Sequence, residues 1–393
     1  MAEHEKIRLL HLVQGLRIGG AEVLLTHYLK ALGTKSYTHY VYNVWQDGPL
    51  RSTIEAMGIV VHNSEPKPSV KNPIRFLVWL IVLLRRLVIF VRQKDIGIIR
   101  SDVGFANQLA ILLGKITVIP AFPTVHNTRA FNTPRYIWNL KVCLNALVDT
   151  LLYPRATKII AISDEVKEIV RERFRSGEKQ VVVVRNGIVF EEDTQDKEGL
   201  RDEFRSLDSG VRFIGVGALD YQKAFDVLVQ AIYLVVKKGF ESLHLLIVGE
   251  GAARRELESM IAEYNIAKYV RLLGIRHDVV KLMRMSDVFV MPSRYEGLSI
   301  AMIEAMACGL PIIGSDAPGL RDCIEHGTNG LLFPVDDHNE LADRMRRLAE
   351  NEALRVELGK GARNSFEREY DMKKNIKALD SLFQAYGEVK HVE

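Results

Sequence analysis

The order strand, glycine-bearing loop, helix occurs twice in this sequence, in residues 7–32 (IRLLHLVQGLRIGGAEVLLTHYLKAL) and in residues 211–238 (VRFIGVGALDYQKAFDVLVQAIYLVVKK). After each occurrence, short β-branched runs alternate with longer stretches of helical apolar periodicity, which is typical of parallel sheets whose strands are joined by helices. The chain has 393 residues, more than the usual size of one domain. The sequence therefore predicts an α/β fold with two doubly wound parallel-sheet domains.

Short apolar runs mark the expected strands. A run such as LHLLIVG is hydrophobic at every position, as in strands that helices cover on both faces. The acid-rich stretch 191–204 (EEDTQDKEGLRDEF) is the expected linker region, which predicts one domain of residues 1–185 and another of residues 186–365. The runs are IRLLHLV, YVYNVW, IGIIRSD, ITVIPAF, KIIAIS and QVVVVRNG in the first half, and VRFIGVG, LHLLIVG, VRLLG, DVFVMPS and PIIGSDAPG in the second.

The cysteines and the first residues bear on the compartment. Cys143, Cys308 and Cys323 are widely spaced and form no CxxC pair, so we expect neither a disulfide framework nor a zinc site. The first residues, MAEHEKIRLLHLV, lack the basic, apolar and cleavage-site regions of a signal peptide. We therefore expect a cytoplasmic protein.

Charge is distributed unevenly. Residues 1–185 carry a net charge of +12 and residues 186–393 a net charge of −8, so the first half is expected to meet an anionic surface or substrate. Residues 67–94 hold seven Lys or Arg and no acid, and their apolar run from Phe76 to Leu84 is too short to span a bilayer. Two interpretations stay open: a basic surface that lies on anionic lipid at the inner face of the cytoplasmic membrane, or a buried crossover helix with arginines at its end.

The most informative stretch is PSRYEGLSIAMIEAMACGLPIIGSDAPG, residues 292–319. Local rules predict a helix that Ser299 caps, that Gly309 ends and that Pro311 keeps from continuing. The backbone N–H groups from Leu298 to Ala301 then point out of the helix start, where the macrodipole also favours an anion. A diphosphate fits such a helix start.

Two glutamates accompany that helix start. Glu304 lies about 7 to 8 Å along the helix axis from Ser299. Its helical neighbours are apolar or small, so its carboxylate needs a partner. A ribose diol offers two donors, and a buried salt bridge is the alternative. Glu296 precedes the helix beside Gly297, which allows close approach of the backbone to a ligand, and Glu296 is placed to accept hydrogen bonds from sugar hydroxyls.

Further candidates follow other strands. Lys223 lies just before a helix, where its ammonium would neutralise charge on a leaving diphosphate, although a solvated lysine is the alternative. The loop GEGAARRE offers backbone at Gly249 and Gly251 to the base or ribose, but Arg254 occupies the last glycine position of a G-x-G-x-x-G fingerprint. Gly217 is a further glycine at the end of a strand.

In the first half, Gly19 and Gly20 lie between a strand and a helix, which suits a tight turn or a phosphate approached by backbone. His126 follows a strand end in PTVHN, and a hydrogen-bonded structural histidine is the alternative to a functional one. The sequence has no D-x-D pair, so a metal-independent site without a cofactor is expected. It has no G-x-x-x-x-G-K-[ST] loop, which removes the simplest ATPase interpretation.

The E-x7-E pattern of Glu296 and Glu304 within EGLSIAMIEAMACGLPIIGSDAPG resembles retaining glycosyltransferase family 4 of the GT-B fold. This resemblance implies two Rossmann-like domains facing across a cleft, with the donor site in the second and the acceptor site mainly in the first. It also implies that a helix in residues 366–393 crosses back to the first domain. The supporting motifs are GLRIGGAE, TVHN, AISDEVKEIV, VVRNGI, KAFD, VGEG, LLGIRHDV, DVFVMPS and GTNGLLFPVDD.

The resemblance also implies roles for matching residues. Glu296, His126 and Lys223 would be catalytic, contacting the donor sugar from the second domain, the sugar across the cleft, and the diphosphate. Glu304 would bind the ribose hydroxyls. The backbone of Gly297, Leu298 and Ser299 would contact phosphates or sugar, with Gly19 and Gly20 beside the diphosphate and Gly217, Gly249 and Gly251 in the donor site. Retention would proceed without an enzyme nucleophile, because the leaving phosphate assists deprotonation of the acceptor.

The chain departs from the family pattern next to the lysine. Gly217, Ala218 and Leu219 stand where the family commonly has G-R-L, so one expected cation is missing, at about 1.5 to 3 kcal/mol for a hydrogen bond to a charged group. Possible substitutes are Arg276, Arg294 and Arg321. Ala224 replaces the usual glycine after the lysine.

The resemblance, with the basic first half, implies a retaining, metal-independent hexosyltransferase that moves a sugar from a nucleotide-diphosphate sugar to a lipid-linked or polysaccharide acceptor in cell-surface polysaccharide biosynthesis. No nucleic-acid partner is expected. Two alternatives stay open: a nucleotide-sugar-binding scaffold subunit without activity, which the missing arginine favours, and a nucleotide-sugar epimerase of the same fold.

Overall fold

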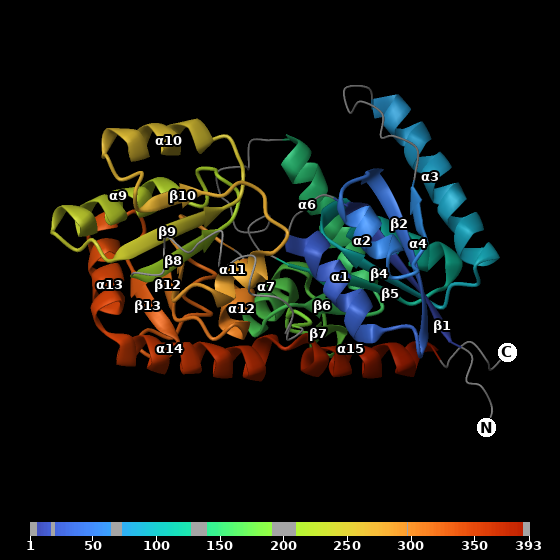
Figure 1. Ribbon diagram of the computed structural model, residues 1–393. Helices are drawn as coiled ribbons and strands as arrows, with labels where there is room; N and C mark the ends of the chain where they lie inside the picture. Colours follow the sequence, from blue (N-terminus) through green and yellow to red (C-terminus); the bar gives the residue numbers. More distant parts are fainter. Residues whose placement is uncertain are drawn as a thin grey trace. The chain divides into compact units, whose positions relative to one another are not determined.

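The computed structural model describes residues 6–16, 20–63, 73–126, 140–190, 210–296 and 298–387. The chain divides into two compact units, one of Met1–Val189 with Met372–Glu393 and one of Phe190–Asp371 (Figure 1). The sequence had suggested divisions after residues 185 and 365. Each unit contains one fully parallel sheet with helices on its faces.

The first unit is built on a seven-stranded sheet in the order β3-β2-β1-β4-β5-β6-β7. In the register of its central strands, His11 of β1 lies beside Arg100 of β4. The strands are β1 (Ile7–Gly15), β2 (Tyr37–Gln46), β3 (Val61–Asn63), β4 (Ile98–Asp102), β5 (Ala121–Val125), β6 (Ile159–Ala161) and β7 (Val181–Val183).

Helices of the first unit bury apolar side chains on both faces of this sheet. On one face, Leu25 and Leu29 pack with strand residues such as Val41. On the other, Leu87 and Leu109 pack against the sheet in a separate cluster. The helices are α1 (Gly20–Leu32), α2 (Leu50–Glu55), α3 (Pro73–Gln93), α4 (Gly104–Thr117), α6 (Leu140–Leu152), α7 (Asp164–Phe174) and α15 (Met372–Gly387).

The second unit has a six-stranded sheet in the order β10-β9-β8-β11-β12-β13. Its largest core cluster joins α9, α10 and α13 to the sheet, while α12 packs on β11 and β12 and against α14. The strands are β8 (Val211–Val216), β9 (Leu243–Val248), β10 (Val270–Leu272), β11 (Val288–Met291), β12 (Ile312–Ser315) and β13 (Gly330–Phe333). The helices are α9 (Phe225–Lys237), α10 (Arg254–Glu263), α11 (Val279–Arg284), α12 (Ile300–Ala307), α13 (His338–Glu350) and α14 (Glu352–Ser365), which a π-helical turn (Phe366–Tyr370) follows.

Both sheets reverse their strand order at one point. In the first unit the reversal lies between β1 and β4, and in the second between β8 and β11. Open α/β sheets bind ligands beyond the carboxyl ends of the strands at such a switch point. The loops that follow these strands are therefore the first places to look for a site.

Three sequence expectations need correction. The run ITVIPAF (116–122) was expected as a strand, but α4 continues to Thr117 and β5 begins at Ala121. Val118 ends that helix in a left-handed conformation (φ 59°), and Pro120 has no N–H to donate to a sheet. The short strands β3 and β13 were not expected, and residues 366–370, assigned to the last helix, form a separate π-helical turn before α15.

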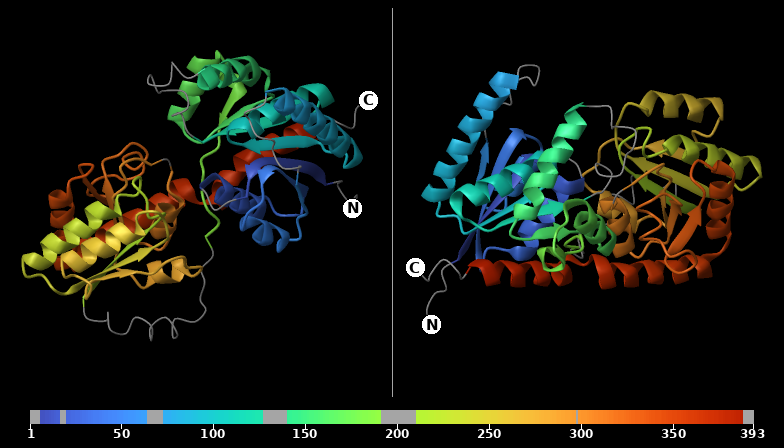
Figure 2. Two further views of the ribbon diagram at one scale, coloured as in Figure 1. Left: turned by 90° about the horizontal axis from the view of Figure 1, so that it is seen from above. Right: turned by 180° about the vertical axis from the view of Figure 1, so that it is seen from behind.

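Helix α3 has two apolar faces. Leu83, Leu87 and Val91 are buried against the first unit. The opposite face exposes Ile74, Leu77, Val78, Ile81, Val82 and Ile89, with exposed fractions between 40% and 73%. In the right-hand view of Figure 2, α3 lies on the outside of its unit. Of the basic segment 67–94, residues 67–72 lie outside the described residues. Within the described ranges, no helix is both long and apolar enough to cross a membrane.

Candidate active site

Two charged side chains meet at the switch point of the second unit. Lys223 lies in the loop after β8, and Glu296 in the loop after β11, the neighbouring strand. Lys223 Nζ donates to Glu296 Oε2 at 2.7 Å, and Gln222 Nε2 lies 3.5 Å from Glu296 Oε1. The Lys223 and Glu296 side chains are 17% and 10% exposed, so water screens this ion pair only partly. The sequence named both residues as candidates, but it gave no reason to expect a direct contact.

Helix α12 begins beside this pair in the sequence, four residues after Glu296. The Ser299 hydroxyl accepts a hydrogen bond from the Met302 N–H at 3.3 Å, which is the predicted N-cap. Gly309 follows the helix with φ of 75°, a conformation that glycine adopts without steric cost. Leu298 is partly buried just before the cap, and Gly297 lies outside the described residues. The cap satisfies one of the N–H groups that a helix start leaves without an intrahelical partner.

Glu304 is a partly buried carboxyl in the second turn of α12. Desolvation by burial raises its pKa to about 7. Within the described part of the chain, its carboxyl group has no hydrogen bond or ion pair. The buried salt bridge that local sequence left open is therefore not present there. A ligand with hydroxyl donors would supply what this carboxylate lacks.

The glycines of the neighbouring loops have a packing role. A Cβ on Gly249 would lie 1.8 Å from the Gly217 carbonyl oxygen, and a Cβ on Gly251 would lie 2.3 Å from the Leu219 carbonyl oxygen. Backbone hydrogen bonds join the same loops, from Gly217 N–H to the Val248 carbonyl at 3.0 Å among others. The loops after β8 and β9 therefore touch backbone to backbone, and their contact with a donor stays a prediction.

None of the three arginines considered as substitutes for Ala218 is without an acidic partner. Arg276 pairs with Asp278 and Arg321 with Asp316. Arg294 pairs with both Asp226 and Asp336 at 2.6 and 2.7 Å. Of these four candidate cations, Lys223 is the one that contacts Glu296. Ala224, which stands where the family has glycine, adopts φ of 51°, a left-handed conformation that costs alanine about 1 to 2 kcal/mol.

Five side chains of the first unit form a closed ring of interactions, here called the polar ring. The Arg100 guanidinium donates to both oxygens of Asp102 at 2.7 and 2.8 Å. Asp102 Oδ1 also contacts His126 Nε2 at 2.9 Å. His126 Nδ1 lies 3.4 Å from Asn186 Nδ2, and the Tyr28 hydroxyl donates to Asn186 Oδ1 at 3.2 Å. Arg100 closes the ring by lying over the Tyr28 ring, 4.0 Å from its centroid.

The polar ring collects residues from distant parts of the chain at the switch point of the first unit. Arg100 and Asp102 belong to β4, His126 follows β5, Asn186 follows β7 and Tyr28 lies on α1. Of these, the sequence singled out His126 alone. A usable signal was present in IIRSD, because a charged residue inside a buried strand needs a partner.

Charged and titratable groups surround the polar ring. Burial would raise the pKa of Asp102, but the Arg100 guanidinium and His126 hold it below its ordinary value. Burial raises the pKa of Glu22 on α1, and the Asp102 charge adds to this effect. Burial also lowers the pKa of His11, with smaller contributions from His39 and Arg100. Asp102 is therefore ionised and accepts hydrogen bonds at neutral pH.

The remaining predicted residues are the two glycines after β1. Gly20 is the first residue of α1, and Gly19 lies outside the described residues. Their place beside a diphosphate stays a prediction. Lys223, Glu296, Leu298, Ser299 and Glu304 thus belong to the second unit, whereas His126 and Gly20 belong to the first.

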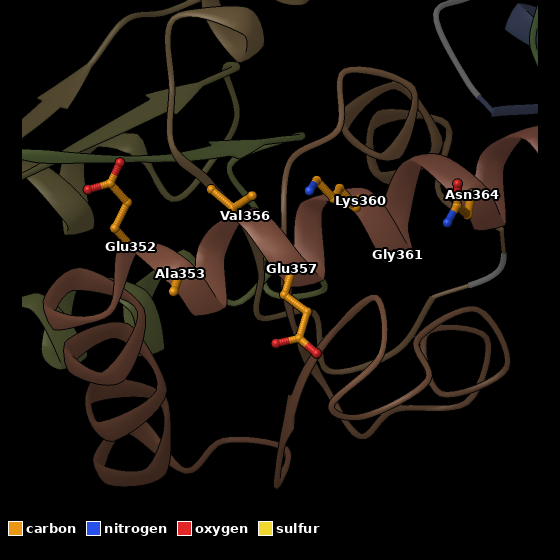
Figure 3. A pocket seen from close by; sticks show the side chains of 7 residues that line it. All are labelled: Glu352, Ala353, Val356, Glu357, Lys360, Gly361 and Asn364. Atoms are coloured by element: carbon orange, nitrogen blue, oxygen red, sulfur yellow. The ribbon is translucent and has the colours of Figure 1, made fainter.

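A separate open hollow of about 740 Å³ lies along α14 (Figure 3). It is lined by Glu352, Ala353, Val356, Glu357, Lys360, Gly361 and Asn364. It shares no residue with the Lys223–Glu296 pair or with α12, and no sequence motif falls on it. Among the described residues, no group of three His, Cys, Asp or Glu could hold a metal ion.

Two family profiles match the chain in succession. The one described as Glycosyltransferase Family 4 matches residues 18–192, and the one described as Glycosyl transferases group 1 matches residues 196–365. The chain belongs to the family 4-type glycosyltransferases. Their GT-B architecture of two Rossmann-like parallel-sheet domains is also the fold of solved structures that resemble this one.

Two curated relatives and one solved structure show what this chain is similar to. The capsular polysaccharide biosynthesis glycosyltransferase CapM of Staphylococcus aureus is 25% identical over 314 residues, which cover 77% of this chain and 80% of CapM. The UDP-Gal:alpha-D-GlcNAc-diphosphoundecaprenol alpha-1,3-galactosyltransferase of Escherichia coli is 26% identical over 232 residues, 58% of this chain and 60% of the enzyme. The crystal structure of Anabaena Alr3699/HepE in complex with UDP superposes with a TM-score of 0.78 at 19% identity, covering 96% of this chain and 100% of that chain.

Proposed function

We propose that this glycosyltransferase transfers a sugar, with retention of configuration, from a nucleotide-diphosphate sugar to a lipid-linked or polysaccharide acceptor in cell-surface polysaccharide biosynthesis. The observation that carries the donor assignment is the meeting of Lys223 and Glu296 at the switch point of the second unit, directly before the start of α12. A cation and a helix start suit a diphosphate, and a carboxylate suits sugar hydroxyls.

The diphosphate would rest on the start of α12 and on Lys223. Because Ala218 stands where the family has a second cation, the helix macrodipole and the single ammonium of Lys223 would stabilise the negative charge of the leaving group. The three arginines considered as substitutes for Ala218 are engaged with carboxylates, so Lys223 is the group that binding can redirect from Glu296 to phosphate. The backbone of Gly297 to Ser299 would complete this contact.

The ribose diol would bind Glu304. Its carboxylate is ionised only at a desolvation cost, which a pair of hydroxyl donors would offset. Glu296 would accept hydrogen bonds from the transferred sugar once Lys223 turns to the phosphate. Both assignments follow the family resemblance and fit the local contacts of the second unit.

In the proposed transfer, the bond between the anomeric carbon and the diphosphate oxygen breaks while the acceptor oxygen bonds to the same face of that carbon. The acceptor proton passes to the leaving diphosphate oxygen. Glu296 holds Lys223 in the free protein, which suits a carboxylate that positions groups better than one that attacks carbon. Charge stabilisation by Lys223 and the helix start would then take the place of a metal ion, so we propose metal-independent transfer.

We also propose peripheral attachment to the inner face of the cytoplasmic membrane through α3. Its outward face combines six exposed aliphatic residues with exposed Arg75, Arg85, Arg86 and Arg92, and α3 contains no acid. Apolar area with basic charge is the composition that binds anionic lipid. The Escherichia coli relative is named for a diphosphoundecaprenol acceptor, which such a position would bring within reach.

The proposed function is tested by thermal unfolding with UDP, GDP, ADP and their glucose and galactose conjugates. A ligand that binds the native state raises the melting temperature. We expect one nucleotide series to stabilise the wild type and to lose its effect in Lys223→Ala and in Glu304→Ala. Stabilisation by no compound, or equal stabilisation of both variants, contradicts the donor site.

Product analysis separates the alternatives. Nucleotide binding without transfer to a panel of undecaprenyl-diphosphate sugars and oligosaccharides would favour the scaffold subunit. A changed nucleotide sugar formed without an acceptor would favour the epimerase. Glycosylated acceptor, with the anomeric configuration of the donor preserved in its NMR spectrum, is the expected result. Activity unchanged by EDTA is expected for the metal-independent route.

A further inference from the structure

Arg294 joins three loops at the carboxyl ends of the strands of the second sheet. It lies in the loop after β11, and its backbone N–H donates to the Gln222 carbonyl, in the loop after β8, at 2.8 Å. Its guanidinium donates to the Tyr221 carbonyl of the same loop at 2.8 Å and to Asp336, in the loop after β13, at 2.7 Å. The proposed function assigns no role to Arg294.

The guanidinium is fixed on several sides. Nη1 and Nη2 donate to the two oxygens of Asp226, in the first turn of α9, at 3.2 and 2.6 Å. The group also lies over the Tyr221 ring, 4.2 Å from its centroid. The Arg294 side chain is 13% exposed, so water screens these contacts only partly. One side chain therefore ties the loops after β8, β11 and β13 together.

The loops after β8 and β11 carry the Lys223–Glu296 pair. Gln222 directly precedes Lys223, and Glu296 comes two residues after Arg294. Both members of the pair lie on loop backbone, so contacts between the loops set the distance between them. Ala224, directly after the lysine, adopts a left-handed conformation that alanine reaches only at a cost. Arg294 is thus placed to hold this loop in the form that brings Lys223 to Glu296.

The charges around Arg294 do not suit an anion site. Asp226 and Asp336 both contact the guanidinium, so the three side chains together carry one negative charge in excess. A phosphate that approached Arg294 would meet this excess charge and would have to displace carboxylates that are already bound. Fixing the loops is the role that these contacts support.

We propose that Arg294 is a positioning residue of the donor site, which fixes the loops after β8 and β11 so that Lys223 is held at Glu296 and is presented to the donor diphosphate. A guanidinium suits this role because its planar fork binds one carboxylate with two bonds while another N–H reaches a second group. A lysine would keep the charge but could not span the loops. The loop contacts rest on the geometry of the second unit, and their use in donor binding rests on the proposed function.

Two competing explanations give different predictions. If Arg294 serves stability alone, its loss destabilises the second unit and leaves nucleotide binding unchanged. If Arg294 replaces the cation that is missing at Ala218, removal of its partner Asp226 strengthens binding, because a negative charge leaves the site. If Arg294 positions Lys223, removal of Asp226 weakens binding, because the guanidinium loses its hold on the start of α9.

Acetylation of the full chain by trace acetic anhydride tests the loops without any ligand. Only the neutral amine reacts, so an ammonium that a carboxylate holds reacts slowly. We expect Lys223 to react on the order of 3- to 10-fold faster in Arg294→Met and in Asp226→Ala than in the wild type, as quantified by mass spectrometry. The exposed Lys268 should keep its rate in each variant. An unchanged rate at Lys223 in either folded variant overturns the proposal.

Isothermal titration with the nucleoside diphosphate that stabilises the wild type in the thermal screen tests the use of the loops. Arg294→Met and Arg294→Lys are both expected to weaken binding on the order of 10-fold, because neither side chain spans the loops. Asp226→Ala is expected to weaken it on the order of 3- to 10-fold. Wild-type affinity in Arg294→Lys, or tighter binding by Asp226→Ala, assigns Arg294 a charge role and overturns the proposal. If Arg294→Met does not fold, as judged by circular dichroism, the other two variants still decide.

Two variants control for the loss of an arginine and for the loss of stability. Arg346→Met removes an arginine that also pairs with two carboxylates, but on α13. Gly239→Ala lowers stability at a turn with open space around it. Neither should change Lys223 acetylation or nucleotide affinity, and equal losses of affinity in Gly239→Ala and Arg294→Met overturn the proposal. Absence of nucleotide binding by the wild type contradicts the proposed function, while the acetylation rates decide by themselves whether Arg294 holds Lys223.

Discussion

Lys223 Nζ and Glu296 Oε2 form a 2.7 Å ion pair at the point where the strand order of the second sheet reverses. Each group is thereby held in place before any ligand arrives. A diphosphate that takes Lys223 must first compete with this carboxylate. If the proposed donor site is correct, binding of the nucleotide and positioning of the sugar are coupled through this one contact.

Replacement of Glu296 by Gln should separate these two effects. It removes the competing charge, so UDP alone, or the nucleotide diphosphate that the screen selects, should bind about 3- to 10-fold more tightly, or roughly 1 kcal/mol. Transfer should nevertheless fall, because the sugar loses its acceptor. Isothermal titration and turnover measure the two. Glu258→Gln, which removes an exposed carboxylate paired with Arg254 on α10, is the control, and weaker UDP binding by Glu296→Gln would contradict the coupling.

Glu304 should make the second unit less stable as pH rises. Its pKa is about 7 in the folded protein against 4.5 for an ordinary glutamate, so the native state binds more protons between these values. The free energy of unfolding therefore falls across that window. Glu304→Gln should remove this slope and add about 1 to 3 kcal/mol at pH 8, nearer the lower figure because the side chain is partly exposed. Urea unfolding at pH 5 and pH 8 measures it.

The same Glu304→Gln variant should lose nucleotide affinity while it gains stability, since the neutral amide is a weaker acceptor for ribose hydroxyls than a carboxylate. Glu256→Gln, an exposed position on α10, should change neither quantity. A variant that is less stable at pH 8 and has the wild-type slope would show that Glu304 is not the desolvated group.

Buried histidines should limit the acid stability of the first unit. The pKa of His11 lies well below 6.5, mainly because of burial, and those of His39 and His27 are lowered too, the latter to about 4. The unfolded state binds more protons below pH 6.5, so stability is complete above that pH and is lost as pH falls. His11→Gln should flatten this fall by up to about 1.4 kcal/mol per pH unit. His277→Asn, at an exposed position, is the control and should leave the acid loss of stability unchanged. An unchanged acid loss of stability in His11→Gln would contradict the prediction.

The outward face of α3 should bind vesicles that contain anionic lipid. Leu77→Ser with Ile81→Ser should weaken sedimentation with phosphatidylglycerol vesicles about tenfold, and binding should fall as salt is added. The melting temperature should not change, because both side chains are more than half exposed. Val356→Ser on α14, also half exposed, is the control. Equal binding to neutral vesicles, or a dimer that the double variant disrupts, would contradict lipid attachment.

Gly249→Ala should damage the second unit through a backbone clash. The new methyl group would lie 1.8 Å from the Gly217 carbonyl oxygen at φ of 141°, and we expect a loss of about 3 kcal/mol or more. Gly239→Ala has a positive φ of 85° but open space, so it should show the conformational cost alone, about 1 to 2 kcal/mol. Chemical unfolding measures the free energy of unfolding of both variants. Equal losses would show that the backbone clash at Gly249 adds no destabilisation.

Much of the fold follows from local patterns. The two strand–loop–helix beginnings predict both sheets, since they impose the βα order that the structure shows at β1–α1 and β8–α9. The capping rules place the start of α12 correctly at Ser299. The strand expected at 116–122 fails because β-branched residues at the end of α4 resemble a strand until Val118 turns the chain.

The contacts within the sites were less accessible to sequence. Lys223 and Glu296 are 73 positions apart, and their contact depends on β8 and β11 being neighbours. Neither Asp102 nor Asn186 was singled out by a sequence motif. They come close together because the carboxyl ends of the strands converge in the folded sheet. The family preference for glycine at position 224 has a local reason, the left-handed backbone that Ala224 adopts at some cost.

Helix α15 belongs to the first unit but is synthesised after the second unit. Phe383 is fully buried beside Phe122, and Asp380 accepts a hydrogen bond from the buried Tyr37. A ribosome therefore makes the whole second unit before it makes the segment that closes the core of the first. Until then the β-strands made earliest have an uncovered apolar face, which is where a chaperone would be needed and where a premature stop would do most harm.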